Sequence, residues 1–335
     1  MRDILTSILY AMQEHGDTVL VTIVESKGSS PRGVGSMMLV GKKGLICGSI
    51  GGGAVEKLGI EQAAECLDQK KPAFVRYSLF DQSTETSGKY SEDADITGMV
   101  CGGEVAVDFH YIAADDEDWK DIAKRSLGIM NNGGQGCLEL DVASNDERVT
   151  MIESGECGSP WFDRKTAYIP FKPEPNAILF GAGHIGKALC LLLKTLSFNV
   201  TVVDDRADYL TRERFPDADR LIVCDFGDFR KEIEPGPEDY IIIMTSGHKH
   251  DLTVESQVLR TQHKYVGMVG SKRKISTTNE RLRELGISED MIRFVHTPVG
   301  LDIGAITPEE IAVSIAAEIV AVRHGKDRDN TSQIQ

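Results

Sequence analysis

A G-x-G-x-x-G motif constrains the fold of this chain more than any other feature. An apolar run at 177–180 leads into the motif, and apolar residues at helical spacing follow it. We expect the first glycine to allow a tight turn, the second to let a phosphate approach the backbone, and the third to let the helix pack on the strand. The helix start then offers N–H groups to an anion. The motif residues are Gly181, Gly183, His184, Ile185 and Gly186. A βαβ unit that binds no ligand is the alternative.

A second apolar strand, expected at 199–203, ends in two acidic residues. Asp204 lies 18 residues after Gly186, close to the spacing of about 20 expected for an acid that binds a ribose hydroxyl. Its carboxylate would favour a free ribose diol over a 2′-phosphate, and Arg206 would reduce that preference.

Short apolar runs alternate with helical patterns through the rest of the C-terminal half. We expect further strands at 221–224, 240–244, 265–269 and 292–295. This alternation predicts an α/β fold with a Rossmann-like, doubly wound parallel sheet. Ligands of such sheets bind beyond the carboxyl ends of the strands, so the residues that follow each strand are candidate site residues.

Polar residues follow two of these later strands. Gly247 and His248 follow the strand at 240–244, and Ser271, Lys272 and Arg273 follow the strand at 265–269. We expect His248 to contact a ligand and the basic pair to attract an anion. A solvated helix start is the alternative for the basic pair. The nearby His250 and Asp251 also permit a metal-ligand interpretation, but with no second ligand cluster we predict no metal site.

The N-terminal half is predicted to be a mixed α+β domain. The sequence indicates helices at 4–12 and 54–69, a strand at 18–25, a hairpin between 37 and 50, and an alternating strand at 105–111. A length of 335 residues suits two domains. The proline-rich stretch 170–175 is the expected linker, so we predict domains at 1–170 and 176–325.

Two loops of the N-terminal half are candidate ligand contacts. Ser30 and Arg32 lie in a Ser/Pro/Arg/Gly loop that can pair with an anion, although Arg32 is equally explained as a solvated loop charge. Three successive glycines, Gly51, Gly52 and Gly53, separate a strand from a helix. They indicate close backbone approach, either to a ligand or to a neighbouring element in a tight turn.

Cys101 follows an acidic, apolar-poor segment at 81–97 and precedes two glycines. We interpret that segment as a surface loop, which makes the Cys101 sulfur more accessible than a typical lone cysteine. The alternative is a buried cysteine that only packs.

Charge and cysteine content exclude several classes of protein. A net charge of −15 disfavours nucleic acids and anionic membranes as partners, because both need a basic surface. The N-terminus does not resemble a signal peptide, and no apolar run is long enough to span a membrane, so we expect a cytoplasmic protein. Seven cysteines without a C-x-x-C pair predict neither a disulfide framework nor a zinc ribbon.

Taken together, these motifs resemble the xanthine dehydrogenase accessory family, also called the XdhC/CoxI family. The resemblance extends from about residue 10 to 325. It includes the G-S-S-P-R loop with Gly35, the triple glycine followed by Glu56, the Cys101-Gly102-Gly103 stretch, the glycine turn, the Asp-Asp-Arg triplet, the Gly247-His248 pair, and the segments 265–274 and 298–305.

The resemblance implies a maturation factor for xanthine dehydrogenase-type molybdenum hydroxylases. Such a factor binds a molybdopterin-type molybdenum cofactor, assists sulfuration, and helps to insert the cofactor into the apo-enzyme, with a cysteine desulfurase supplying sulfur. We expect a homodimer in which the Cys101 thiolate contacts or transfers sulfur to molybdenum across a cleft between the domains. The alternative is an NAD(P)-dependent oxidoreductase that binds NAD or another nucleotide, with His184 or His248 assisting hydride transfer.

Overall fold

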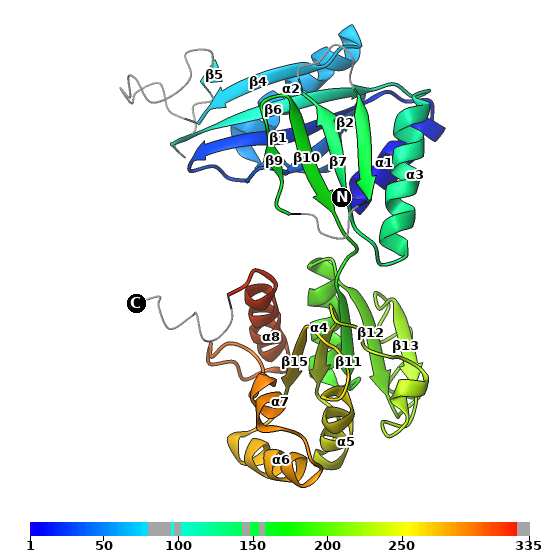
Figure 1. The fold of residues 1–335 in the computed structure, drawn as a ribbon, viewed down its shortest axis with the longest axis vertical. Coiled ribbons are helices and arrows are strands. Elements are labelled where there is room, and N and C mark those ends of the chain that lie inside the picture. The colour runs from blue at the N-terminus through cyan, green and yellow to red at the C-terminus, as the bar shows by residue number, and fades with distance from the viewer. Residues whose placement is uncertain (80–94, 97–101, 143–147, 154–157, 327–335) are drawn as a thin grey trace. The chain divides into compact units, whose positions relative to one another are not determined.

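The computed structural model describes residues 1–79, 95–96, 102–142, 148–153 and 158–326, without the side chains of 95–96, 248–249 and 272–274. Backbone contacts divide the chain into two compact units, Met1–Pro173 and Glu174–Gln335 (Figure 1). The expected linker overlaps this boundary: strand β10 (Thr166–Phe171) ends just before it, and β11 (Asn176–Phe180) begins just after it.

Unit 1 is built around a six-stranded sheet in the order β3-β2-β1-β6-β4-β5. Its strands are β1 (Thr18–Gly28), β2 (Met37–Gly41), β3 (Gly44–Gly48), β4 (Ala73–Ser78), β5 (Asp95–Ile96) and β6 (Gly103–Ile112). A second sheet, β8-β7-β10-β9, contains β7 (Gly136–Asp141), β8 (Val149–Glu153) and β9 (Trp161–Phe162) with β10. The strands and the hairpin predicted for this half are confirmed, and so is its mixed α+β class.

Strand β1 is buried on both faces, because its alternate side chains enter two different cores. Leu20 and Val24 pack with α1 (Arg2–Gln13), α3 (Glu117–Asn131) and the second sheet. Val19, Val21 and Ile23 point the other way and pack with α2 (Gly53–Gln69). The period of two along β1 therefore places helices on both sides of the main sheet.

Unit 2 is a five-stranded, fully parallel sheet in the order β13-β12-β11-β14-β15, as predicted for the C-terminal half. It adds β12 (Asn199–Asp204), β13 (Arg220–Val223), β14 (Tyr240–Ile243) and β15 (Tyr265–Met268) to β11. Helices α4 (His184–Thr195) and α8 (Pro308–Arg323) cover one face. The opposite face packs on α5 (His248–Val258), α6 (Lys272–Glu284), α7 (Glu289–Phe294) and the 3₁₀ turn η1 (Phe229–Lys231).

The strand predicted at 292–295 is wrong, because residues up to 294 form helix α7. Ser288 caps this helix, its hydroxyl accepting a hydrogen bond from the Met291 N–H at 3.4 Å, and two acidic residues follow in the first turn. These are helix-start signals that outweigh a short apolar run. Beyond the helix, His296 forms a single parallel bridge with Gly267 of β15.

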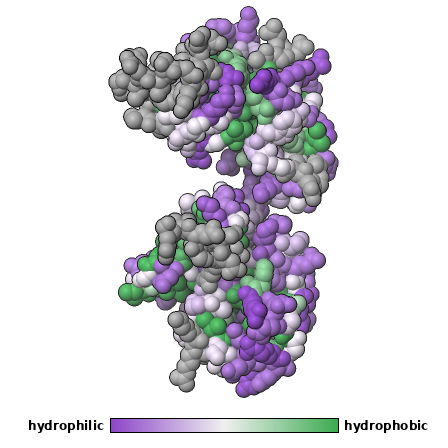
Figure 2. Space-filling model, turned by 60° about the vertical axis from the view of Figure 1, so that its left-hand side comes forward, coloured by the Kyte–Doolittle hydropathy of each residue, from purple (hydrophilic) through white to green (hydrophobic). Residues whose placement is uncertain are grey.

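The face of the molecule drawn in Figure 2 is largely hydrophilic, in keeping with the net charge of −15. Figure 2 shows polar side chains over much of both units, with apolar side chains in smaller groups between them. Within the described residues, no helix has both the length and the apolar composition needed to cross a membrane.

Candidate functional site

The three glycines of the turn between β11 and α4 have different environments. Gly181 has a φ of +120°, and a Cβ there would collide with the Met244 carbonyl of the loop after β14. A Cβ on Gly186 would collide with the Gly181 carbonyl, so this glycine permits the close packing of α4 on the turn. A Cβ on Gly183 would meet no atom within 4 Å. The backbone at Gly183 is therefore open to a ligand.

The first turn of α4 is a suitable place for a phosphate group. Gly183 is the N-cap residue, and among the described residues no side chain caps this helix. An uncapped helix start presents unsatisfied N–H groups and a partial positive charge. The turn lies between the carboxyl ends of β12 and β14, at the point where the strand order reverses, which is where α/β sheets bind ligands.

Asp204, at the end of β12, is buried and fully engaged within the protein. Its side chain is only 1% exposed. One carboxylate oxygen accepts hydrogen bonds from the Ala182 N–H at 2.6 Å and from the Arg206 guanidinium at 2.9 Å. The other accepts from the Arg206 N–H at 3.0 Å and Nε at 2.8 Å. Burial raises the pKa of Asp204, but the hydrogen bonds from Arg206 and Ala182 outweigh burial and hold that pKa below its ordinary value.

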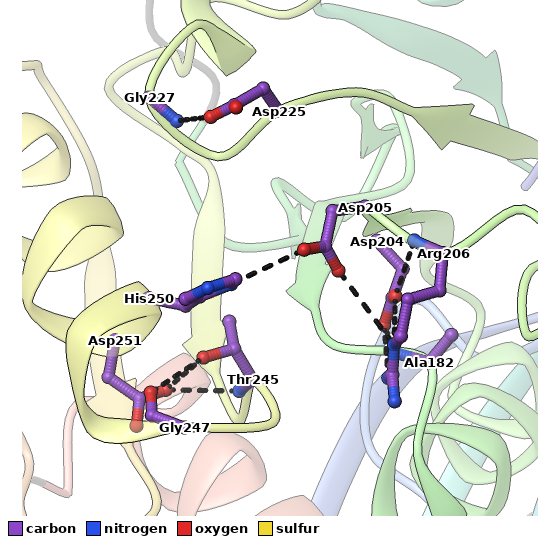
Figure 3. A network of polar contacts seen from close by, with 10 residues as sticks. All are labelled: Ala182, Asp204, Asp205, Arg206, Asp225, Gly227, Thr245, Gly247, His250 and Asp251. Atoms are coloured by element: carbon purple, nitrogen blue, oxygen red, sulfur yellow. Dashed lines mark hydrogen bonds and ion pairs between the residues drawn. The ribbon is translucent and has the colours of Figure 1, made fainter.

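Asp205 lies next to it in the chain and has a different environment. Its side chain is 29% exposed. One carboxylate oxygen lies 3.4 Å from Nδ1 of His250, in the first turns of α5 (Figure 3). The His250 ring contacts Phe226 edge-on, with 5.4 Å between centroids. The pair thus brings together the chain segments that follow β12, β13 and β14.

Two arginines and a tyrosine form a stack beside the glycine turn. The guanidinium of Arg206 lies 4.1 Å from the ring centroid of Tyr209, and that of Arg214 lies 5.1 Å from it. Arg214 also donates to the Ala182 carbonyl at 3.1 Å. Arg214 therefore attaches the segment 206–214 to the turn directly, and Arg206 does so through the Asp204 carboxylate.

The remaining predicted site residues of unit 2 come after the carboxyl ends of β14 and β15. Gly247 has a φ of +144° and precedes α5, which begins at His248. Ser271 is exposed and precedes α6, which begins at Lys272 and continues through Arg273. The side chains of His248, Lys272 and Arg273 lie outside the described part of the structure, so their predicted contacts stay predictions.

The metal-ligand interpretation of His250 and Asp251 has no geometric support. His250 faces Asp205, whereas the buried Asp251 accepts hydrogen bonds from the Thr245 N–H at 3.0 Å and the Thr245 hydroxyl at 2.7 Å. Among the described residues, no group of three or more His, Cys, Asp or Glu side chains could hold a metal ion.

In unit 1, the structure brings together the glycine-rich motifs that are far apart in the sequence. Gly28 of β1 pairs with Gly103 of β6, and Gly51 packs against Pro31, where a Cβ would approach the proline ring to 2.9 Å. Ser30 shares a 2.8 Å hydrogen bond with Ser26 and donates to the Arg32 carbonyl at 2.8 Å. Cys101, adjacent to this cluster in sequence, lies outside the described residues.

Glu56 acts inside unit 1 as a helix cap. Its carboxylate turns back over the first turn of α2 and accepts from the Ser49 hydroxyl at 2.6 Å and the Gly52 N–H at 3.2 Å. The triple glycine lies at this helix start; Gly52 and Gly53 have positive φ angles of 70° and 60°. The tight-turn interpretation of these glycines therefore has direct support.

The sequence indicates His250 only as a candidate metal ligand, and its motifs do not include Asp205 or Arg214 among the site residues. Asp205 and Asp204 are adjacent acids, and spacing alone selected the first. His250 and Arg214 come from later segments, and only the topology brings His250 to Asp205 and Arg214 to the glycine turn.

The parallel sheet, its glycine turn and the acid at the end of β12 define a two-unit protein with a Rossmann-type domain. Residues 177–319 match the family described as the XdhC Rossmann domain, and residues 11–78 match the XdhC and CoxI family. The chain belongs to the XdhC/CoxI family, as its motifs predicted.

Individual relatives agree with this placement. The chain is 28% identical to a probable xanthine dehydrogenase component of Bacillus subtilis, over 93% of this chain and 95% of that protein. It is 22% identical to the molybdenum cofactor insertion chaperone PaoD of Escherichia coli, over 98% of this chain and 91% of that protein. A crystal structure of a xanthine dehydrogenase from Bacillus halodurans superposes with a TM-score of 0.78 at 25% identity, covering 98% of this chain and 96% of that one.

Proposed function

We propose that this protein is an accessory factor that binds molybdenum cofactor, assists its sulfuration and helps to insert it into a xanthine dehydrogenase-type apo-enzyme. The observation that carries the proposal is the open, uncapped start of α4 at Gly183, in a chain that belongs to the XdhC/CoxI family. The similarity to PaoD, a molybdenum cofactor insertion chaperone, supports the same role.

The residues present suit the chemistry of this cargo. Molybdenum cofactor is a pterin with a dithiolene and a terminal phosphate or dinucleotide, so a phosphate site is the first requirement. The start of α4 supplies backbone N–H groups, which bind phosphate without a charged side chain. Lys187, one turn into α4, adds a cation on the same helix.

We assign to Cys101 a thiolate contact with the molybdenum of the bound cargo, because thiolates are preferred ligands of soft metals. Two cysteines in the described part of the chain instead favour the neutral thiol. Burial raises the pKa of Cys190 to about 11, and burial with neighbouring acids also raises the pKa of Cys224.

The proposal has three further parts. A cysteine desulfurase supplies the sulfur, the protein is a homodimer, and it is located in the cytoplasm.

The test compares Gly183→Val with Gly128→Val. Neither glycine has a positive φ, and a Cβ at either position meets no atom within 4 Å, so both variants should fold. The valine at 183 covers the phosphate site. We expect it to weaken calorimetric binding of purified molybdenum cofactor by about 2–3 kcal/mol, the scale of a lost charge-assisted hydrogen bond. Client xanthine dehydrogenase activity in cells should fall accordingly.

Cys101→Ser is the second variant, with Cys224→Ser as its control. We expect Cys101→Ser to retain cofactor binding while the client accumulates without its sulfido ligand. Full client activity with Cys101→Ser at normal expression would reject the role of this cysteine. Unchanged cofactor affinity in folded Gly183→Val would reject the proposed site.

The oxidoreductase alternative would use the same helix start, and experiments on the purified protein distinguish the two functions. Turnover of NAD(P) with a reducible substrate, unaffected by loss of the client enzyme, would favour that alternative. The proposed accessory role predicts that client maturation, rather than nicotinamide turnover, responds to Gly183→Val.

A further inference from the structure

The end of β12 carries two adjacent carboxylates of which only one is accessible. Within the described residues, the Asp204 carboxylate accepts four hydrogen bonds, all from Ala182 and Arg206, and the side chain is 1% exposed. A ligand hydroxyl would have to displace one of those donors, and a buried charge that loses its partner is strongly destabilising. Asp204 is therefore poorly placed to receive a ribose.

Asp205 has the properties that Asp204 lacks. Within the described part of the chain, its carboxylate lies 3.4 Å from His250 Nδ1 and makes an ion-pair contact at 3.8 Å with Arg206 Nε. Both are longer than a normal charge-assisted hydrogen bond. His250 Nδ1 is buried and has no hydrogen-bond partner among the described residues. A carboxylate and a ring nitrogen thus face each other with unused hydrogen-bonding capacity.

Asp205 and His250 lie where the ribose of a nucleotide can reach when its phosphate is on the glycine turn. The parallel register sets β12 beside β11, so a ligand with its phosphate on the glycine turn can reach the end of β12. Asp205 follows β12, and His250 comes from the first turn of α5 after β14 (Figure 3). A ribose over the end of β12 would meet Asp205, whereas the Phe226 ring is 3% exposed and belongs to the core, so it is not available to a base.

We propose that Asp205, with His250 beside it, binds the ribose diol of a nucleoside diphosphate whose phosphates lie on the start of α4, and that Asp204 only anchors the loop. The inference rests on the proposed phosphate site. The diphosphate belongs either to an adenine dinucleotide or to the dinucleotide form of molybdenum cofactor. Both share the ribose and differ in the base.

The test is calorimetric titration of the full chain with ADP, CDP and their 2′,3′-dideoxy analogues. We expect wild type to bind the better ribonucleotide at least about tenfold more tightly than its dideoxy analogue, the scale of a hydrogen bond to a charged group. Asp205→Asn should weaken binding of the ribonucleotide and abolish that discrimination. Preference for ADP indicates an adenine dinucleotide, and preference for CDP indicates the cytosine dinucleotide form of the cofactor.

Two controls isolate the diol contact. Asp204→Asn should keep the discrimination and lower the unfolding temperature. Asp225→Asn removes a charge from the neighbouring loop, where the carboxylate accepts from the Gly227 N–H at 2.7 Å, and should also keep it. Discrimination that survives in Asp205→Asn, or disappears in a stably folded Asp204→Asn, would overturn the inference. Wild type that binds neither nucleotide would also overturn it, while client activity would still test the proposed function separately.

Discussion

Asp204 shows how a charged residue can be buried near a binding site without belonging to it. Its carboxylate connects the first residues of the glycine turn to Arg206, and Arg206 in turn stacks on Tyr209. The charge is compensated by four hydrogen bonds, which is the condition for burying a carboxylate at tolerable cost. The side chain therefore shapes the turn on which the ligand is proposed to lie.

This arrangement predicts a dependence of stability on pH. Because the folded pKa of Asp204 lies below its ordinary value of 3.8, the stabilisation is present above that value and is lost as the pH falls through the folded pKa. Asp204→Asn should lower the free energy of unfolding near neutral pH by about 1–3 kcal/mol. Urea unfolding between about pH 5 and pH 3 should show a smaller loss of stability in the variant than in wild type. Identical losses would show that the carboxylate is not held in its charged form.

At the scale of elements, the helix starts of this chain are determined by local sequence. Helix α8 begins with a reciprocal cap in which the Thr307 hydroxyl accepts from the Glu310 N–H at 3.2 Å and the Glu310 carboxylate accepts from the Thr307 N–H at 3.0 Å. Pro308 follows at the first helical position. These signals were readable in the sequence and predicted the helix.

Thr307→Ala should therefore destabilise the protein by about 1 kcal/mol, because a helix N-terminal N–H loses its acceptor. Chemical denaturation monitored by circular dichroism measures this loss. Thr195→Ala is the matched control: this threonine ends α4, and its hydroxyl only donates to the Leu191 carbonyl of the preceding turn at 3.0 Å. An equal loss in both variants would show that the cap at Thr307 contributes nothing specific.

The same local signals explain which elements were predicted and which were not. Buried strands bounded by glycines or turns, such as β1 and β11, were identified because apolar β-branched runs have few alternatives. The segment 292–295 is equally apolar, but the Ser288 cap makes it the end of a helix. In the site, spacing identified the end of β12 but not which of its two acids is buried, since that depends on Arg206 and on the distant His250.

At the scale of the whole molecule, the two units have separate cores. The core clusters of Met1–Pro173 contain no residue of the other unit, and those of Glu174–Gln335 are likewise self-contained. A fragment that begins at Glu174 should therefore unfold cooperatively by itself and bind ADP with the affinity of the full chain. Thermal unfolding and calorimetry of the fragment test this. A fragment that does not fold would contradict the independence of the two cores, and one that folds without the ADP affinity of the full chain would show that unit 2 alone does not form the nucleotide site.

The Glu56 cap makes the two glycine-rich helix starts chemically unlike. A carboxylate attached to the same helix competes for the start of α2 at a high effective concentration, because it never diffuses away. A free phosphate compound present at cellular levels has to outcompete this tethered carboxylate at α2, whereas no capping side chain opposes it at α4 within the described residues. Of these two glycine-rich helix starts, α4 is therefore the one at which a free anion meets no tethered competitor among the described residues.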